Sequence, residues 1–168
     1  MPTEYGCLFC ITGLERNVVT YLGQKKIQAI SPFKLRYRRH RGVANLESVT
    51  LFPGYVFFTA DSEGLDPQIL RSHSDVIKVL YSGNDTRWAL IRSDRVFAEE
   101  LFAVDGEIGL SSAYYVGDRI HIEDGFLKKY EGEIIAVNRR AKTAHIKVTI
   151  SDKVFSLWLG FEEIEKTE

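Results

Sequence analysis

Cys7 and Cys10 form a C-x-x-C pair, which is the spacing in this chain that most directly suggests chemistry. Such pairs occur in redox motifs and zinc sites. On an extended strand, however, residues three apart point to opposite faces and lie about 10 Å apart, whereas a disulfide needs Cα atoms within about 7 Å. Four histidines are present, and none has the spacing of a further zinc ligand: His40, His73, His121 and His145. We therefore interpret both cysteines as buried structural thiols and expect no metal.

Motifs of nucleotide-dependent or hydrolytic enzymes are also missing from the sequence. It contains no P-loop, no nucleotide-binding glycine pattern and no nucleophile elbow. The pattern favours a binding protein without a cofactor, not an enzyme.

Basic residues gather in two runs, although the net charge of the 168 residues is only −1. Local basic patches matter more for phosphate binding than the sum over the chain. No acidic residue lies between Glu15 and Glu47, and that window holds the first run: Arg16, Lys25, Lys26, Lys34, Arg36, Arg38, Arg39 and Arg41. The second run lies near the C-terminus: Lys128, Lys129, Arg139, Arg140, Lys142, Lys147 and Lys153. Either run could instead be an ordinary solvated surface, and both interpretations stay open.

Part of the first run lies on a predicted strand, in which apolar and basic residues alternate with a period of two. Apolar Phe33, Leu35 and Tyr37 alternate with basic residues, so one face is apolar and the other is uniformly basic. The sequence RHRG then predicts a turn into a second strand, Val43–Thr50.

The rest of the first half predicts an α+β domain. Tyr5–Ile11 and Leu51–Ala60 are expected strands, the second an edge strand or a bulged one because it contains Pro53 and Gly54. Asp66 followed by a proline predicts a helix start. We expect Ser93 to cap a further helix.

After a Gly- and Ser-rich segment near 105–113, the chain shows short strands only. Their alternating patterns predict a small closed β-barrel, in which Ile146 and Val148 point inward and Arg139 and Arg140 lie in a turn. The expected strands are listed in chain order: Arg119–Ile122, Gly132–Val137, Thr143–Ile150 and Lys153–Leu159.

Targeting signals are not apparent. No apolar run approaches the roughly 18 residues of a membrane span, and the first ten residues lack the pattern of a signal peptide. Two cysteines in such a chain suggest a reducing cytoplasm.

Two motifs together resemble the NusG family of transcription elongation factors: LFPGYVFF at 51–58 and VGDRIHIEDGFLKKYEGEIIAV at 116–137. The resemblance covers nearly the whole chain. It implies an α+β fold, in which a NusG N-terminal (NGN) domain has an antiparallel sheet flanked by helices and an SH3-like KOW β-barrel follows. The expected boundaries are 1–106 for the NGN domain, 107–113 for a linker and 114–168 for the KOW domain.

RNA polymerase is the partner that the resemblance implies, through the clamp of its largest subunit. The expected polymerase-binding residues are aromatic: Phe9, Phe52, Tyr55 and Phe57. Large aromatics on a sheet face suit a protein interface. The alternative is that they are core residues.

Two departures from the family pattern suggest a specialised paralog of the LoaP or RfaH type. The first strand begins Tyr5-Gly6 where general members have Trp-Tyr. The KOW turn that usually reads Phe-Gly-Arg is Ser151-Asp152-Lys153, so the aromatic anchor for Rho or for ribosomal protein S-ten is absent. The resemblance then implies antitermination at particular operons by a monomer. The alternatives are a general NusG factor and a ribosome-associated KOW protein.

Nucleic acid is the second expected partner: the expected ligand of the KOW cations is RNA such as a leader hairpin, and the basic face of the first run could hold either the same RNA or the non-template DNA strand. The expected contacts combine both basic runs with one histidine: Lys34, Arg36, Arg38, Lys128, Lys129, Arg139, Arg140, Lys142, His145 and Lys147.

Overall fold

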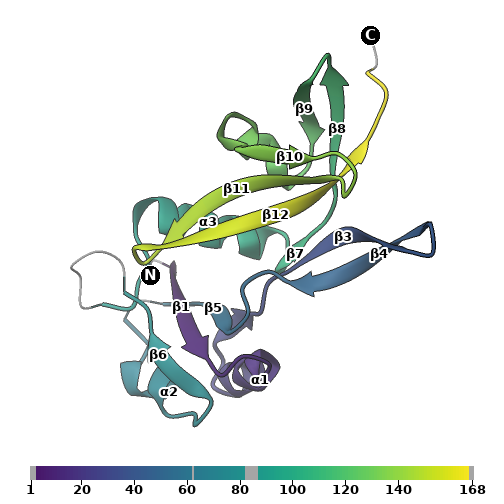
Figure 1. The fold of residues 1–168 in the computed structure, drawn as a ribbon. Helices are drawn as coiled ribbons and strands as arrows, with labels where there is room; N and C mark the ends of the chain where they lie inside the picture. The colour runs from purple at the N-terminus through teal and green to yellow at the C-terminus, as the bar shows by residue number, and fades with distance from the viewer. Residues whose placement is uncertain (1–2, 62, 82–86, 167–168) are drawn as a thin grey trace. The chain divides into compact units, whose positions relative to one another are not determined.

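The computed structural model describes residues 3–61, 63–81 and 87–166 and divides the chain into two compact units. Neither unit is continuous in sequence (Figure 1). The first combines Met1–Pro32, Phe52–Gly106 and Thr149–Lys153, and the second combines Phe33–Leu51, Glu107–Val148 and Val154–Glu168. The domain boundaries expected from the sequence stay a prediction.

The first unit contains a four-stranded sheet of order β2-β5-β1-β6. Its strands are β1 Thr3–Cys10, β2 Gln28–Ile30, β5 Tyr55–Asp61 and β6 Val76–Val79. β1 and β5 pair antiparallel, with Cys7 opposite Phe57. The expectation that Pro53 and Gly54 lie inside an edge strand or a bulged strand is wrong: they form a turn before β5, and β5 pairs on both sides. Because Pro53 lies outside the strand, its missing N–H removes no hydrogen bond from the sheet.

Three helices belong to this unit: α1 Glu15–Gln24, α2 Pro67–Arg71 and α3 Arg92–Ala103. The predicted start of α2 is confirmed, because Asp66 accepts a hydrogen bond from Gln68 N at 3.0 Å. The expected cap on α3 is wrong. Ser93 lies inside the helix, and Ile91 at the cap position makes no side-chain capping bond.

Both faces of the sheet are buried. One face carries Leu8, Val56 and Phe58, which join Val18 and Leu22 of α1 in one hydrophobic cluster. Gly6 is required there because a Cβ atom at that position would lie 2.2 Å from Cζ of the Phe58 ring. Phe58 thus packs directly over the backbone of its partner in β1.

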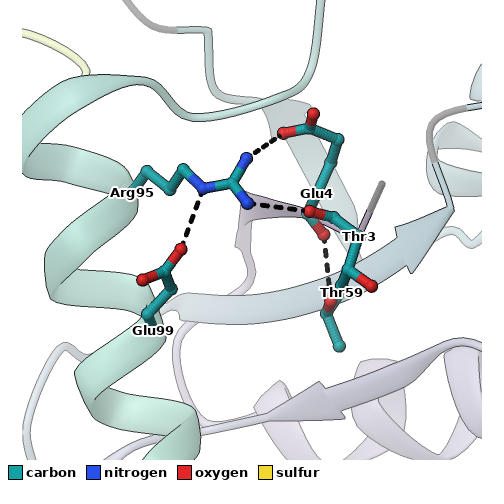
Figure 2. Close-up of polar contacts among 5 residues, drawn as sticks. All are labelled: Thr3, Glu4, Thr59, Arg95 and Glu99. Carbon is teal, nitrogen blue, oxygen red and sulfur yellow. Dashed lines mark hydrogen bonds and ion pairs between the residues drawn. The ribbon is translucent and has the colours of Figure 1, made fainter. Parts of the chain in front are cut away.

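Arg95 ties α3 to the start of β1 (Figure 2). Its guanidinium donates to Glu4 Oε2 at 2.7 Å, to the Thr3 carbonyl at 3.0 Å and to Glu99 Oε1 at 2.9 Å. Thr59 Oγ1 in turn donates to the Glu4 carbonyl at 2.9 Å. This network fixes the helix along the sheet.

The second unit contains a three-stranded sheet of order β4-β3-β7. Its strands are β3 Phe33–His40, β4 Val43–Thr50 and β7 Glu107–Ile108. The predicted turn is confirmed: Arg41 and Gly42 join β3 to β4 with φ values of 52° and 79°. Positive φ at both central residues matches the twist of a two-residue hairpin.

A curled five-stranded sheet of order β10-β11-β12-β8-β9 lies in the C-terminal part of the chain, consistent with the small barrel expected from the sequence. Its strands are β8 Ser111–Val116, β9 Arg119–Asp124, β10 Ala136–Asn138, β11 Thr143–Ile150 and β12 Lys153–Glu163. Ile146 and Val148 are buried as predicted. The expected strand Gly132–Val137 is mostly wrong, because the 3-10 helix η1, Phe126–Glu133, occupies its start.

Candidate binding surfaces

The four aromatic residues expected to meet a partner lie together in the first unit. Phe9 of β1 is 5.0 Å from Tyr55 of β5 between ring centroids, and Phe52 is 5.8 Å from Phe57. Tyr55 and Phe57 alternate with Val56 and Phe58 along β5, so they lie on the opposite face of the sheet. Phe9 is the partner of Tyr55 in β1 and therefore shares that face, and Phe52 packs against Phe57 from the turn before β5. The structure therefore assembles them as one aromatic cluster, defined here as Phe9, Phe52, Tyr55 and Phe57.

Burial within the aromatic cluster is uneven. Phe52 is 2% exposed, Tyr55 6% and Phe57 0%, while Phe9 is only partly buried. Phe97 of α3 packs edge-on against Phe52 at 5.9 Å and was missed as a member of this group. The helical spacing of Phe97 and Leu101 was the sequence signal that could have identified it, since that spacing places both residues on the buried face of α3.

Two polar groups border this cluster. Lys153 Nζ donates to the Tyr55 hydroxyl at 2.8 Å and lies 5.4 Å from the Tyr55 ring centroid. Glu15 accepts from Gly54 N at 2.6 Å and from Gly13 N at 3.1 Å. Burial alone would raise the pKa of Glu15, but these N–H groups and its own hold that pKa below its ordinary value.

The predicted basic face of β3 is present in the second unit. Arg36 Nε contacts Glu47 Oε1 at 2.7 Å, and Arg38 Nη1 lies 3.5 Å from Glu47 Oε2. Lys34 donates to the Trp158 carbonyl. Burial, together with the neighbouring Arg36, holds the pKa of Lys34 below its ordinary value. Glu47 thus pairs with two of the three cations, and Lys34 is held by a backbone carbonyl.

A groove of roughly 730 Å³ runs along this basic face. We call it the basic groove and define it by Lys34, Arg36, Arg38, Asn138, Thr143 and Trp158. A smaller groove of roughly 350 Å³ in the same unit is lined by Tyr37 and Arg39 with Arg140 and Lys142. Cations from both sequence runs therefore line neighbouring grooves.

The remaining predicted nucleic-acid contacts line neither groove. Lys128 of η1 donates to the Ile122 carbonyl at 2.9 Å, and Lys129 follows it on the same helix. Arg139 stacks on the Tyr115 ring at 3.7 Å, and Lys147 lies exposed on β11. His145 stacks on Trp158 with centroids 4.6 Å apart.

Trp158 is the groove residue that sequence reasoning missed. The sequence does contain a signal for its exposure. Side chains alternate along a strand, so Trp158 points outward if Leu157 and Leu159 point inward, and both leucines are buried.

Both cysteines are buried and unpaired. Burial, with a smaller effect from Glu15, raises the pKa of Cys10 to about 11, and burial also raises the pKa of Cys7. Thiols held in this protonated form are poor nucleophiles and poor metal ligands. Among the residues that the structure describes, no group of His, Cys, Asp and Glu could hold a metal ion. No helix in the described ranges is long and apolar enough to cross a membrane.

Comparison with known families places the chain. The family model described as "Transcription termination factor nusG" matches residues 4–98, which is more than half of the 168 residues. The chain belongs to the NusG family of transcription factors.

Other comparisons add less. A solved structure described as "Domain interaction in Thermotoga maritima NusG" is similar with a TM-score of 0.46 and 16% identity. The match covers 95% of this chain and 94% of that one. No curated protein matches the sequence.

Proposed function

We propose that this NusG-family protein is a specialised factor that binds RNA polymerase and promotes processive elongation by suppressing termination at particular operons. In this proposal residues 1–106 form the polymerase-binding domain, 107–113 a linker and 114–168 the KOW domain. KOW cations contact nucleic acid, with RNA as the expected ligand.

The polymerase contact is assigned to the aromatic cluster. Clustered aromatics are common anchors of protein interfaces, because each ring buries a large area at a low cost in conformational entropy. Phe9 is the member that is partly exposed, whereas Phe52, Tyr55 and Phe57 are each less than a tenth exposed. The three buried rings can contact a partner only if the residues that cover them move away. Phe9 is therefore the position at which a substitution can test binding without removing a core side chain.

The specialised role is supported chiefly by the turn between β11 and β12. Ser151 and Asp152 occupy it with φ values of 51° and 66°. The family pattern places a phenylalanine at this turn, and a serine offers no ring to fill a partner's pocket. We infer that the termination and ribosome contacts made through that ring in general members are weak or lost here.

A general termination role is the second candidate, favoured by the description of the matching family model. The two roles differ in the sign of their effect on transcription through a terminator. A specialised antiterminator raises read-through on its own leader sequences, and a general factor acts alike on all templates.

The test begins with capture of RNA polymerase from a cell extract on the immobilised full-length protein, with and without RNase. We expect capture to survive RNase treatment and Phe9→Ala to weaken it about tenfold or more, as loss of an aromatic hot spot does. Ile77→Ala is the matched control, because Ile77 is an exposed apolar residue of the same sheet. Equal capture by both variants would remove the aromatic cluster from the interface.

Single-round transcription then separates the two roles. The account predicts more read-through of terminators on a responsive leader than on unrelated templates. Equal stimulation of termination on all templates would favour the general factor.

A further inference from the structure

We propose that the basic groove binds a single-stranded nucleic-acid segment, with Trp158 as the platform on which one base stacks. This inference rests on the proposed function only in expecting nucleic acid as a ligand. It differs from the proposed function in two ways. The site lies on β3 and β12, and the other cations of the KOW barrel are not part of it.

Charge along the groove favours a phosphodiester backbone. Lys34, Arg36 and Arg38 alternate along β3, so the three cations lie in a row on one face. Among the described residues, Glu47 is the one acidic residue that lines the groove, and it contacts two of the three cations. The side chain of Arg38 remains 70% exposed, so its guanidinium can contact a ligand in solvent.

The indole of Trp158 supplies the stacking surface. It is 37% exposed although its neighbours Leu157 and Leu159 are 3% and 1% exposed, so the strand holds the ring outward between two buried anchors. The imidazole of His145 lies nearly parallel to it, with an interplanar angle of 14°, and braces the ring. An aromatic ring beside a row of cations is the arrangement that binds single strands without sequence preference.

The size and lining of the groove select a single strand over other ligands. Roughly 730 Å³ is the volume of a small-ligand site and has room for a short segment of a single strand. Asn138 and Thr143 also line the groove, and the Asn138 side-chain amide retains its N–H donors for a base edge. An apolar peptide would find two aromatic rings there, Tyr37 and Trp158, and a row of charges that it could not pair.

The experiment measures fluorescence anisotropy of labelled oligouridylate and oligothymidylate, each of about twelve nucleotides, with full-length protein at several salt concentrations. Trp158→Ala should weaken binding about tenfold, and Trp158→Phe should retain most of the affinity. The double variant Lys34→Gln and Arg38→Gln should lower the slope of log affinity against log salt by about 1.4, since each phosphate contact on a single strand contributes about 0.7.

The matched control removes the same charge elsewhere. Arg16 and Lys26 are exposed residues of the first unit. Arg16→Gln with Lys26→Gln should leave affinity and salt slope unchanged. Circular dichroism and thermal unfolding of every variant confirm that the fold is kept.

Three results would overturn the proposal: no binding of either oligonucleotide, equal affinity of wild type and Trp158→Ala, or an equal loss in the control double variant. Tighter binding of RNA than of DNA would assign the segment to RNA through the 2′-hydroxyl, and the reverse would assign it to DNA. Polymerase capture from the same preparations separates the two ideas. Capture without oligonucleotide binding contradicts the groove alone, and oligonucleotide binding without capture contradicts the proposed function alone.

Discussion

The central strand β5 and the hairpin of β3 and β4 differ sharply in what covers them. Tyr55, Val56, Phe57 and Phe58 are four consecutive buried residues, because both faces of their sheet are covered. In β4, by contrast, most residues are exposed on both faces. Aromatic side chains in the first region therefore hold the fold together, whereas cations in the second remain available to a ligand. The continuous apolar run of β5 is thus buried on both faces, whereas the hairpin keeps polar side chains in solvent.

The largest expected effect comes from removing a buried ring. Phe57→Ala should lower the free energy of unfolding by about 3–5 kcal/mol, because Phe57 is fully buried and the substitution leaves a cavity. Tyr37→Ala in the hairpin should cost about 1 kcal/mol or less. Urea denaturation of both variants provides the measurement. Similar losses would mean that the two regions do not differ as described.

Two glycine substitutions test how tightly the sheet of the first unit is packed. Gly6→Ala should destabilise the protein by about 1–3 kcal/mol, because the new Cβ would lie 2.2 Å from the Phe58 ring. Gly23→Ala should stabilise it by about 0.5–1 kcal/mol, since Gly23 lies in α1 with no atom within 4 Å of the added carbon. Thermal unfolding curves of the two variants should shift in opposite directions. A stable Gly6→Ala protein would show that Phe58 can move aside.

Glu15 tests how the turn before β5 is held. Glu15→Gln should cost about 1.5–3 kcal/mol at neutral pH, because a charged acceptor is lost from Gly13 N and Gly54 N. The folded-state pKa of Glu15 is lowered from 4.5, so its stabilisation is present above that value and is lost as the pH falls through the folded-state pKa. Unfolding midpoints measured from pH 7 down to about 3 should therefore converge for wild type and variant. A constant difference across that range would contradict the assignment.

The smallest effect on stability is expected at Glu47. The ion pairs of Glu47 with Arg36 and Arg38 lie at the surface, so Glu47→Gln should leave the free energy of unfolding nearly unchanged. Binding of oligouridylate should nevertheless tighten, because the substitution removes the carboxylate that competes with phosphate for both arginines. Weaker binding would indicate that Glu47 orders the cations instead.

Sequence reasoning predicted the elements whose signals are local. The alternation in β3, the turn at Arg41 and Gly42 and the cap at Asp66 each depend on a few neighbouring residues, and all are present. It failed where distant contacts decide. Pro53 and Gly54 suggested an edge strand, although β5 is central, because strand order depends on pairing with β1 and β2.

The candidate sites show the same limit. Residue type and period placed Lys34, Arg36 and Arg38 on one face, and they line the basic groove. Trp158 joins them from a strand more than a hundred residues later in the chain, a neighbour that no local pattern specifies. Similarly, the motif identified Tyr55 and Phe57 as a pair, but only the packing of Phe97 shows how the face they share is covered.

The two tryptophans allow the most direct test, because one packs against β5 and the other lines the groove beside β3. Trp88 is 8% exposed and packs against Phe58 with ring centroids 5.2 Å apart, whereas Trp158 lines the basic groove. Addition of oligouridylate to isotope-labelled full-length protein should shift the indole N–H resonance of Trp158 and leave that of Trp88 in place. A shift of Trp88 alone, or of neither resonance at saturating oligonucleotide, would contradict the account.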